Sequence, residues 1–396
     1  MGAFAADEPS VLVIGAGPAG ISTAYYLERA GIPYRVLDRD LTPASTWANL
    51  YESLRLNTAG FVSHLPGRRL PLRYGIYPSG RQYYAYLSAY LRDHCFAIDL
   101  GVDVKRVAPT DSGTGWQVET SAGAQAVPAV VIATGRFCNP YLPEIPGRAS
   151  FRGQFLHASA YRRPEDFAGK HVLVVGSGPS GGDIAVDLAR SAATPVRLAI
   201  RSDLVIARSY PYGLPTTAWV LLAELLPKRW RKGFLNRVSY QTYPGQEHLG
   251  LPLAPNRDDR SGTSAPVRGP ELIREVKAGR IRPVAGLARL NETSAVLMDG
   301  SEMPADAVIL CTGYRPAIDY LDVPYETDAD GWMVRRSEDS QQVKDYPGLY
   351  LVGRFYRGLG PLHNIRREAR IAVDEISSYL AERAGSVSPI DIIEGR

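Results

Sequence analysis

The sequence is poor in cysteine: its 396 residues include three, Cys95, Cys138 and Cys311. No two of them are close along the chain, which excludes a CxxC redox motif, a zinc knuckle and a disulfide framework. We therefore expect no metal site. Thiols scattered in this way fit a reducing compartment, so we expect a cytoplasmic protein.

The chain also lacks long apolar runs and a large excess of either charge. A transmembrane helix needs about 18 or more consecutive apolar residues, and since no such run occurs we expect no integral membrane segment. The N-terminus has no basic segment followed by an apolar one, as a signal peptide would. The formal net charge is +4, from 45 Lys and Arg against 41 Asp and Glu, which is too small for a dedicated nucleic-acid binder.

What the sequence does contain is a glycine loop between an apolar run and an amphipathic stretch. Residues 11–14 read as a buried strand, and residues 18–30 as a helix that follows the loop. In a GxGxxG loop the first glycine permits a tight turn, the second lets a pyrophosphate approach the backbone, and the third lets helix and strand pack. The next strand, residues 34–38, ends in an acid at the distance expected of a ribose-binding carboxylate. The predicted dinucleotide-binding residues are Gly15, Gly17, Pro18, Ala19, Gly20, Asp38 and Arg39.

The same pattern occurs a second time, with one difference. The strand 170–175 leads into a second GxGxxG loop and a helix, but the following strand, 196–200, ends in Arg201 instead of an acid. An arginine there can form a charge-assisted pair with a 2′-phosphate, which an acid would repel. We therefore expect FAD or NAD at the first loop and NADP at the second; the alternative for Arg201 is a solvated strand end. The residues predicted to bind at the second site are Gly176, Gly178, Pro179, Ser180, Gly181, Arg201 and Ser202.

Two Thr-Gly pairs divide the chain. Thr134-Gly135 and Thr312-Gly313 each follow an apolar strand, where a chain would cross between domains. The predicted fold class is α/β, with two nested Rossmann-like dinucleotide-binding domains and an inserted segment. Residues 1–163 would begin the FAD-binding domain, 164–312 would form the NADPH-binding domain with an insertion at about 209–265, and 313–385 would complete the first domain. The tail, 386–396, ends in a typical added protease site.

A linker motif gives a family resemblance. Phe151, Gly153, His157 and Tyr161 have the spacing FxGxxxHxxxY, followed by a basic residue. This resembles the signature of the flavin-containing monooxygenases, which have the glutathione-reductase-like arrangement of two nested domains. The segment that ends in Tyr314 is similar to that family's TGY segment. The resemblance extends over nearly the whole chain and includes compact bacterial and plant members, among them the indole-pyruvate monooxygenases.

The resemblance implies cofactors and a reaction. It implies FAD and NADPH as cofactors, and O2 and a small molecule as substrates. One oxygen atom would pass from a flavin hydroperoxide to nitrogen or sulfur. The first alternative is Baeyer–Villiger or decarboxylating oxygenation of a carbonyl compound; a distant one is a non-catalytic, NADPH-binding flavoprotein. The lack of CxxC speaks against a disulfide oxidoreductase. The sequence does not decide whether the protein forms a homodimer.

The resemblance also assigns residues near the flavin. Trp47 would line it, although the family often has Gly-Gly just before this tryptophan and this chain has Ala44 and Ser45. Asn57 is the predicted catalytic residue, beside the flavin; the alternative is a turn asparagine that satisfies local backbone. Arg55 would contact flavin or substrate, or lie on the surface, which we favour.

The C-terminal part of the resemblance places a helix and a returning strand at the flavin. Gly353 would end the strand, and Leu362 lies in the last FAD segment. The helix, expected over residues 365–380, would direct its N-terminus at the flavin; alternatively it is a surface helix with Asn364 as N-cap. In the linker motif, His157 and Tyr161 would order the chain between domains and not act as catalysts.

The inserted segment is the part that no motif explains. It contains an apolar turn at residues 219–226 and a basic run at 228–232, which favour an amphipathic helix with a solvated end over a membrane contact. We expect the insertion to cover the cleft and to supply substrate contacts. Its tyrosines, whose orientation the sequence leaves open, are Tyr210, Tyr212, Tyr240 and Tyr243.

Overall fold

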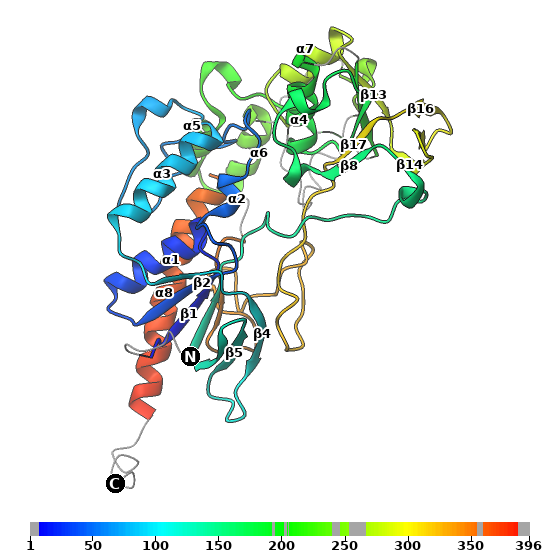
Figure 1. The fold of residues 1–396 in the computed structure, drawn as a ribbon. Helices are drawn as coiled ribbons and strands as arrows, with labels where there is room; N and C mark the ends of the chain where they lie inside the picture. Colours follow the sequence, from blue (N-terminus) through cyan, green and yellow to red (C-terminus); the bar gives the residue numbers. More distant parts are fainter. Residues whose placement is uncertain are drawn as a thin grey trace.

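Two parallel β-sheets, each with its own helices, make up the two lobes of the molecule (Figure 1). The computed structural model describes residues 8–191, 195–201, 204, 206–239, 246–252, 267–354 and 359–386. Short 3₁₀ turns connect several elements, at Leu72–Tyr74, Arg148–Ser150, Ala158–Ala160, Pro164–Phe167, Pro211–Gly213 and Glu247–Leu249.

The first sheet has the strand order β18-β7-β1-β2-β3, with every pairing parallel. Its strands are β1 (Val11–Ile14), β2 (Tyr34–Asp38), β3 (Ile98–Leu100), β7 (Ala129–Ile132) and β18 (Leu349–Leu351). Both faces are covered, which explains why β1 and β7 are buried along their whole length and read as continuous apolar runs.

Alternate residues of the first sheet serve two different cores. On one face, Val11 and Val13 pack among helices α1 (Pro18–Arg29), α3 (Gly80–Asp93) and α8 (Pro361–Ser386). On the other, Leu12 and Ile14 pack with an antiparallel sheet that contributes Trp116. The strands of that sheet are β4 (Val104–Pro109), β5 (Trp116–Thr120) and β6 (Gly123–Val127).

The second sheet has the order β13-β10-β9-β17-β8 and is also parallel throughout. Helices α4 (Pro179–Ser191) and α7 (Glu271–Lys277) contribute to the core on one side. A small antiparallel sheet, β14 (Leu287–Leu290), β15 (Ser294–Leu297) and β16 (Glu302–Pro304), contributes to the other. The parallel strands are β8 (Gln154–His157), β9 (Val172–Val175), β10 (Val196–Ile200), β13 (Ile281–Ala285) and β17 (Ala307–Leu310).

The two sheets share one plan, and the predicted α/β fold class is confirmed. In each, the strand before a glycine loop lies between the next strand and the strand before a Thr-Gly pair. The edge strand beside the strand of the Thr-Gly pair differs between the sheets. In sequence, β18 comes after the other strands of its sheet, whereas β8 comes before the other strands of its sheet. The expected boundary at residue 163 therefore lies beyond β8, a strand that belongs to the second sheet, because Gln154–His157 pairs with β17. The nested division otherwise stays a prediction.

The inserted segment forms two helices in its described part, α5 (Thr216–Glu224) and α6 (Lys228–Ser239). Pro227 separates them, so the apolar turn and the basic run lie on different helices. A two-stranded sheet, β11 (Ile206–Ala207) and β12 (Val267–Arg268), brackets the segment. Across the described ranges, no helix combines the length and apolarity required to span a membrane.

Candidate functional site

One cleft of about 2070 Å³ lies between the lobes, at the carboxyl ends of the parallel strands. This is where open α/β sheets bind their ligands. Both glycine loops and both Thr-Gly pairs line it, as do most of the predicted binding residues. Gly20 and Gly181 do not, because they lie beneath the loops where helix meets strand. Ser202 lies outside the described residues.

In the first glycine loop, the central glycine has space for a side chain, whereas the first and the last have none. Gly15 has a φ of +107°, and a Cβ there would lie 2.6 Å from the carbonyl oxygen of Ala133. A Cβ on Gly20 would lie 1.8 Å from the carbonyl oxygen of Gly15. A Cβ on Gly17 would meet nothing within 4 Å, since this residue faces the open cleft. The loop thus has the shape of a phosphate cradle at the N-terminus of α1.

The second glycine loop repeats these constraints. Gly176 has a φ of +116°, and its Cβ would lie 2.5 Å from the carbonyl oxygen of Cys311. A Cβ on Gly181 would lie 1.9 Å from the carbonyl oxygen of Gly176, whereas Gly178 again has open space. The two loops are therefore equivalent in geometry, and both open into the same cleft.

The residues that follow the loops differ in charge, as expected from the sequence. Oδ2 of Asp38 accepts a hydrogen bond from the N–H of Ala16 at 2.6 Å, and Oδ1 accepts one from the N–H of Asp40 at 2.9 Å. Burial raises the pKa of the Asp38 carboxyl. In the second lobe Arg201 is exposed at the cleft, and no hydrogen bond or ion pair ties it to another described residue. Its guanidinium is available to an anionic ligand.

The segment beside the first loop has a residue in a conformation that favours glycine. Ala44, the N-cap of α2 (Ser45–Ala48), has φ 54° and ψ 35°, in the left-handed region. Glycine adopts this conformation most easily. This chain adopts it with alanine, and Trp47 lines the cleft, packed against the buried Tyr83 with ring centroids 4.4 Å apart.

Asn57 lines the cleft and is partly exposed, and its side chain makes no hydrogen bond within the described structure. A turn asparagine that satisfied local backbone would show such a bond. Its neighbour Arg55 is exposed and donates to the carbonyl oxygen of Tyr77 at 3.2 Å. The amide of Asn57 is therefore free to meet a ligand.

Helix α8 begins earlier than the sequence indicated. It starts at Pro361, and the N–H of Asn364 donates to the carbonyl oxygen of Gly360 at 3.1 Å. Asn364 thus lies inside the first turn, so the alternative that made it the N-cap was wrong; a proline at the first position favours the earlier start. Leu362 and Ile365, near the start of α8, line the cleft, as does Gly353.

The linker motif fastens residues 151–161 to the second lobe. Nε2 of His157 donates to the carbonyl oxygen of Gly313 at 3.0 Å, and Nδ1 accepts from the N–H of Ser159 at 3.1 Å. Burial lowers the pKa of His157, which favours the neutral ring. The hydroxyl of the fully buried Tyr161 donates to Oδ2 of Asp187 at 2.9 Å. Neither side chain shows the geometry of an acid–base catalyst.

The other two motif residues, Phe151 and Gly153, are in close contact. A Cβ on Gly153 would lie 2.4 Å from the ring of Phe151, so glycine allows the phenylalanine to fold under the linker. Phe151 is 5% exposed and packs in the core between the second sheet and β14–β16. Phe151, Gly153 and Tyr161 do not line the cleft, in contrast to His157.

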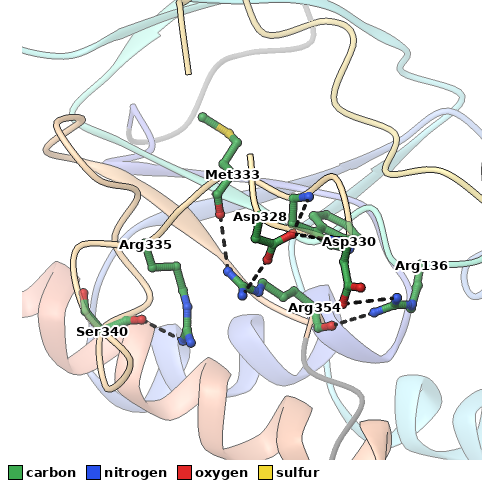
Figure 2. A network of polar contacts seen from close by, with 8 residues as sticks. Arg136, Asp328, Asp330, Met333, Arg335, Ser340 and Arg354 are labelled. Carbon is green, nitrogen blue, oxygen red and sulfur yellow. Dashed lines mark hydrogen bonds and ion pairs between the residues drawn. The ribbon is translucent and has the colours of Figure 1, made fainter. Parts of the chain in front are cut away.

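A polar network beside the returning strand, several of whose residues line the cleft, was missed from the sequence (Figure 2). Arg354 forms an ion pair with Asp328 at 2.7 Å and donates to the carbonyl oxygen of Met333 at 3.3 Å. Arg136 donates to the carbonyl oxygen of Arg354 at 3.2 Å and lies 3.6 Å from Asp330. Residues 327–333 thus fold over the end of the returning strand. No motif marks these residues; the one signal was an arginine directly after Gly353.

The comparisons with known proteins agree with this geometry. The family model described as pyridine nucleotide-disulphide oxidoreductase matches residues 12–221. The probable indole-3-pyruvate monooxygenase YUCCA1 of Arabidopsis thaliana is 31% identical over 362 residues, which cover 88% of this chain and 85% of that protein. A solved flavin-containing monooxygenase from Stenotrophomonas maltophilia is 26% identical, with a TM-score of 0.69, over 95% of this chain and 100% of that one. The chain belongs to the flavin-containing monooxygenase family.

The predicted family and enzyme class are thus confirmed: the chain is an oxidoreductase, a flavin monooxygenase. Cyclohexanone monooxygenase from Rhodococcus sp. Phi1, solved with NADP+ bound, shares the fold, with a TM-score of 0.67 at 18% identity, over 96% of this chain and 85% of that one.

Two of the three thiols of this monooxygenase are disfavoured as redox nucleophiles. Burial raises the pKa of the thiols of Cys138 and Cys311, which disfavours the reactive thiolate. Cys95 is exposed, and all three cysteines are free.

The described part of the insertion lines the cleft with apolar side chains instead of tyrosines. Val220 of α5 and Leu235 of α6 line it, together with the polar Thr216 of α5. Tyr210 and Tyr212 are 47% and 65% exposed and do not; Tyr240 and Tyr243 lie outside the described residues. Helix α5 is held against the first lobe because Thr217 Oγ1 accepts from the N–H of Ala59 at 3.3 Å.

Proposed function

We propose that this monooxygenase binds FAD at the first glycine loop and NADPH at the second, and transfers one atom of O2 to nitrogen or sulfur of a small molecule. The observation that carries the proposal is the pair of equivalent glycine loops, each with an open central glycine, facing a single cleft. NADPH would supply electrons, and bound FAD would supply the activation of O2. We also propose that the enzyme acts in the cytoplasm.

Several residues of the first lobe fit FAD. The N-terminus of α1 and Gly17 would hold the diphosphate, and Asp38 would accept a ribose hydroxyl. Asp330 also lines the cleft, and its Oδ1 is buried without a hydrogen-bond partner in the described structure, so a cofactor hydroxyl that reached this oxygen would satisfy it. Trp47, which also lines the cleft, would pack against the cofactor.

The second lobe fits NADPH better than NADH. The N-terminus of α4 and Gly178 would hold the diphosphate, and the free, exposed guanidinium of Arg201 would pair with the 2′-phosphate. The carboxylate of Asp38 occupies the equivalent place in the first lobe and would repel such a phosphate.

The substrate end of the cleft is expected where the insertion meets the first lobe. Val220, Leu235 and Leu362 give this region an apolar lining, and Asn57 supplies a free amide. Apolar walls exclude water from the site, and the amide can orient substrate or cofactor. A small, largely uncharged amine or thioether suits this lining.

Product analysis with 18O-labelled O2 tests the proposal. The FAD-loaded enzyme with NADPH should convert tertiary amines or thioethers to products that carry one labelled atom. Asn57→Ala should lower the product formed per NADPH consumed and raise hydrogen peroxide, whereas Asn291→Ala, in the turn between β14 and β15, should change neither. Unlabelled product, or no FAD binding, would refute the proposal.

A second candidate is decarboxylating oxygenation of a 2-oxo acid. It is favoured by the names of the plant relatives, which are indole-3-pyruvate monooxygenases. The same assay separates the two: carbon dioxide released from an aromatic 2-oxo acid, with labelled oxygen in the remaining acid and no reaction with amines or thioethers, would establish this second activity.

A further inference from the structure

An acid at the junction of the lobes has no part in the function described so far. Asp183 lies in α4, two residues after Gly181, and lines the cleft. Its Oδ2 accepts a hydrogen bond from the hydroxyl of Tyr51 at 3.2 Å. Tyr51 follows α2 in the first lobe and is 8% exposed. A carboxyl group of the second glycine loop's helix is thus held by a side chain of the other lobe.

The surroundings of Asp183 disfavour a charged carboxylate. Burial is the largest effect, and the acids Glu271 on α7 and Asp187 on α4 add to it, so that the pKa of Asp183 is raised to about 6. The hydrogen bond from Tyr51 acts in the opposite direction. The negative charge of Asp183 in turn acts on the buried thiol of Cys311. No cation is among the groups that act on Asp183, although an acid in the first turns of a helix is usually stabilised as an anion.

A nucleotide at this loop would bring further negative charge. The diphosphate of NADPH is proposed to bind at the N-terminus of α4, within the first turns of which Asp183 lies. A like charge nearby favours the neutral form of a carboxyl group. A carboxylate that already lies near its titration point in the free enzyme would then be converted to the acid at neutral pH.

We propose that Asp183 belongs to the NADPH site as a neutral acid, which takes up one proton from solvent when the nucleotide binds. The inference rests on the proposed nucleotide site. The proton is bound at Oδ1, which makes no hydrogen bond in the described structure, while Oδ2 continues to accept from Tyr51. The neutral group gains one O–H donor and can donate to an oxygen of the nucleotide, which the carboxylate could not do. Asp183 is therefore a binding and positioning residue.

Calorimetric titration of the FAD-loaded enzyme with NADP+ tests this inference. The dependence of the binding heat on the buffer's ionisation enthalpy gives the number of protons taken up. We expect roughly half a proton or more per nucleotide at pH 7, and a dissociation constant that rises by up to about tenfold per pH unit above neutrality. Asp183→Asn, which has nearly the shape of the neutral acid, should take up far fewer protons and bind with a flatter pH dependence.

Two further variants test the environment of the acid. Tyr51→Phe removes the hydrogen bond that favours the carboxylate, so Asp183 would already be protonated at higher pH in the free enzyme. Proton uptake at pH 7 should fall, and its pH window should move upward. Asp319→Asn, at an exposed acid elsewhere in the cleft, should leave uptake as in the wild type. Any titration of the nucleotide's own 2′-phosphate is common to all variants and cancels in the comparison.

Three results would overturn the inference. The first is NADP+ binding to the wild-type enzyme without proton uptake between pH 6.5 and 8, which needs no variant. The second is equal uptake by the wild type and Asp183→Asn. The third is no NADP+ binding at any pH, which would overturn the proposed nucleotide site itself and with it this inference. Only the first two leave the proposed function standing.

Discussion

A substitution at the central glycine of the second loop should raise the stability of the fold and lower the affinity for NADPH. In Gly178→Ala the added methyl group meets nothing within 4 Å, and the backbone is not in the left-handed region. The folded protein should therefore accept alanine, with a gain of about 0.4–1 kcal/mol because the unfolded chain loses freedom. The methyl group lies in the cleft, where a diphosphate would approach the backbone. We expect affinity for NADPH to fall roughly 10–100-fold, which is about 1.4–2.8 kcal/mol.

The assay combines thermal unfolding, flavin absorbance and titration with NADPH. Gly17→Ala is the matched control, because its Cβ also has open space but lies in the first loop. It should lose FAD and keep the affinity for NADPH, the reverse of Gly178→Ala. Gly181→Ala should instead lower the melting temperature, since its Cβ would lie 1.9 Å from a backbone oxygen. If Gly178→Ala released FAD and left NADPH binding unchanged, the assignment of the two loops would be wrong.

Three other substitutions give independent tests. Arg201→Ala should raise KM for NADPH far more than KM for NADH, because the lost ion pair concerns only the 2′-phosphate; equal effects in steady-state assays would refute that role. Tyr161→Phe should lower the free energy of unfolding by about 1–3 kcal/mol in urea, because a buried carboxylate loses its donor; a change near zero would contradict this. Burial lowers the pKa of His64, His157 and His363, so the unfolded chain protonates these groups first and their contribution to stability should fall as pH drops from about 7 toward 5, against the opposite trend of Asp183. In urea titrations across this pH range, the free energy of unfolding of His157→Gln should depend less on pH than that of the wild type. An unchanged dependence would show that His157 does not contribute to it.

The predictions that held concern local patterns. Each glycine loop joins a strand to a helix within about a dozen residues, so the turn and its neighbours can be read from adjacent positions. The α/β class and the monooxygenase family followed from these loops and the linker motif between them. The described structure places both loops on one cleft, which adjacent residues alone could not show.

The features that were missed depend on residues far apart in sequence. Strand β8 belongs to the second sheet because it pairs with β17, some 150 residues later. The hydrogen bond between Tyr51 and Asp183 spans 132 positions, and the raised pKa of the acid depends on burial between two lobes. Asn364 was misplaced for a local reason, since Pro361 can start a helix without an N–H donor.

The two Thr-Gly crossings have a mechanical consequence, because they run side by side. The N–H of Tyr141 donates to the carbonyl oxygen of Gly313, Thr312 Oγ1 donates to that of Tyr141, and the N–H of Arg315 donates to that of Asn139. These bonds tie the two crossings into one antiparallel pair. Any movement of one lobe relative to the other must therefore displace both crossings together, so a change at either Thr-Gly pair should affect both nucleotide sites.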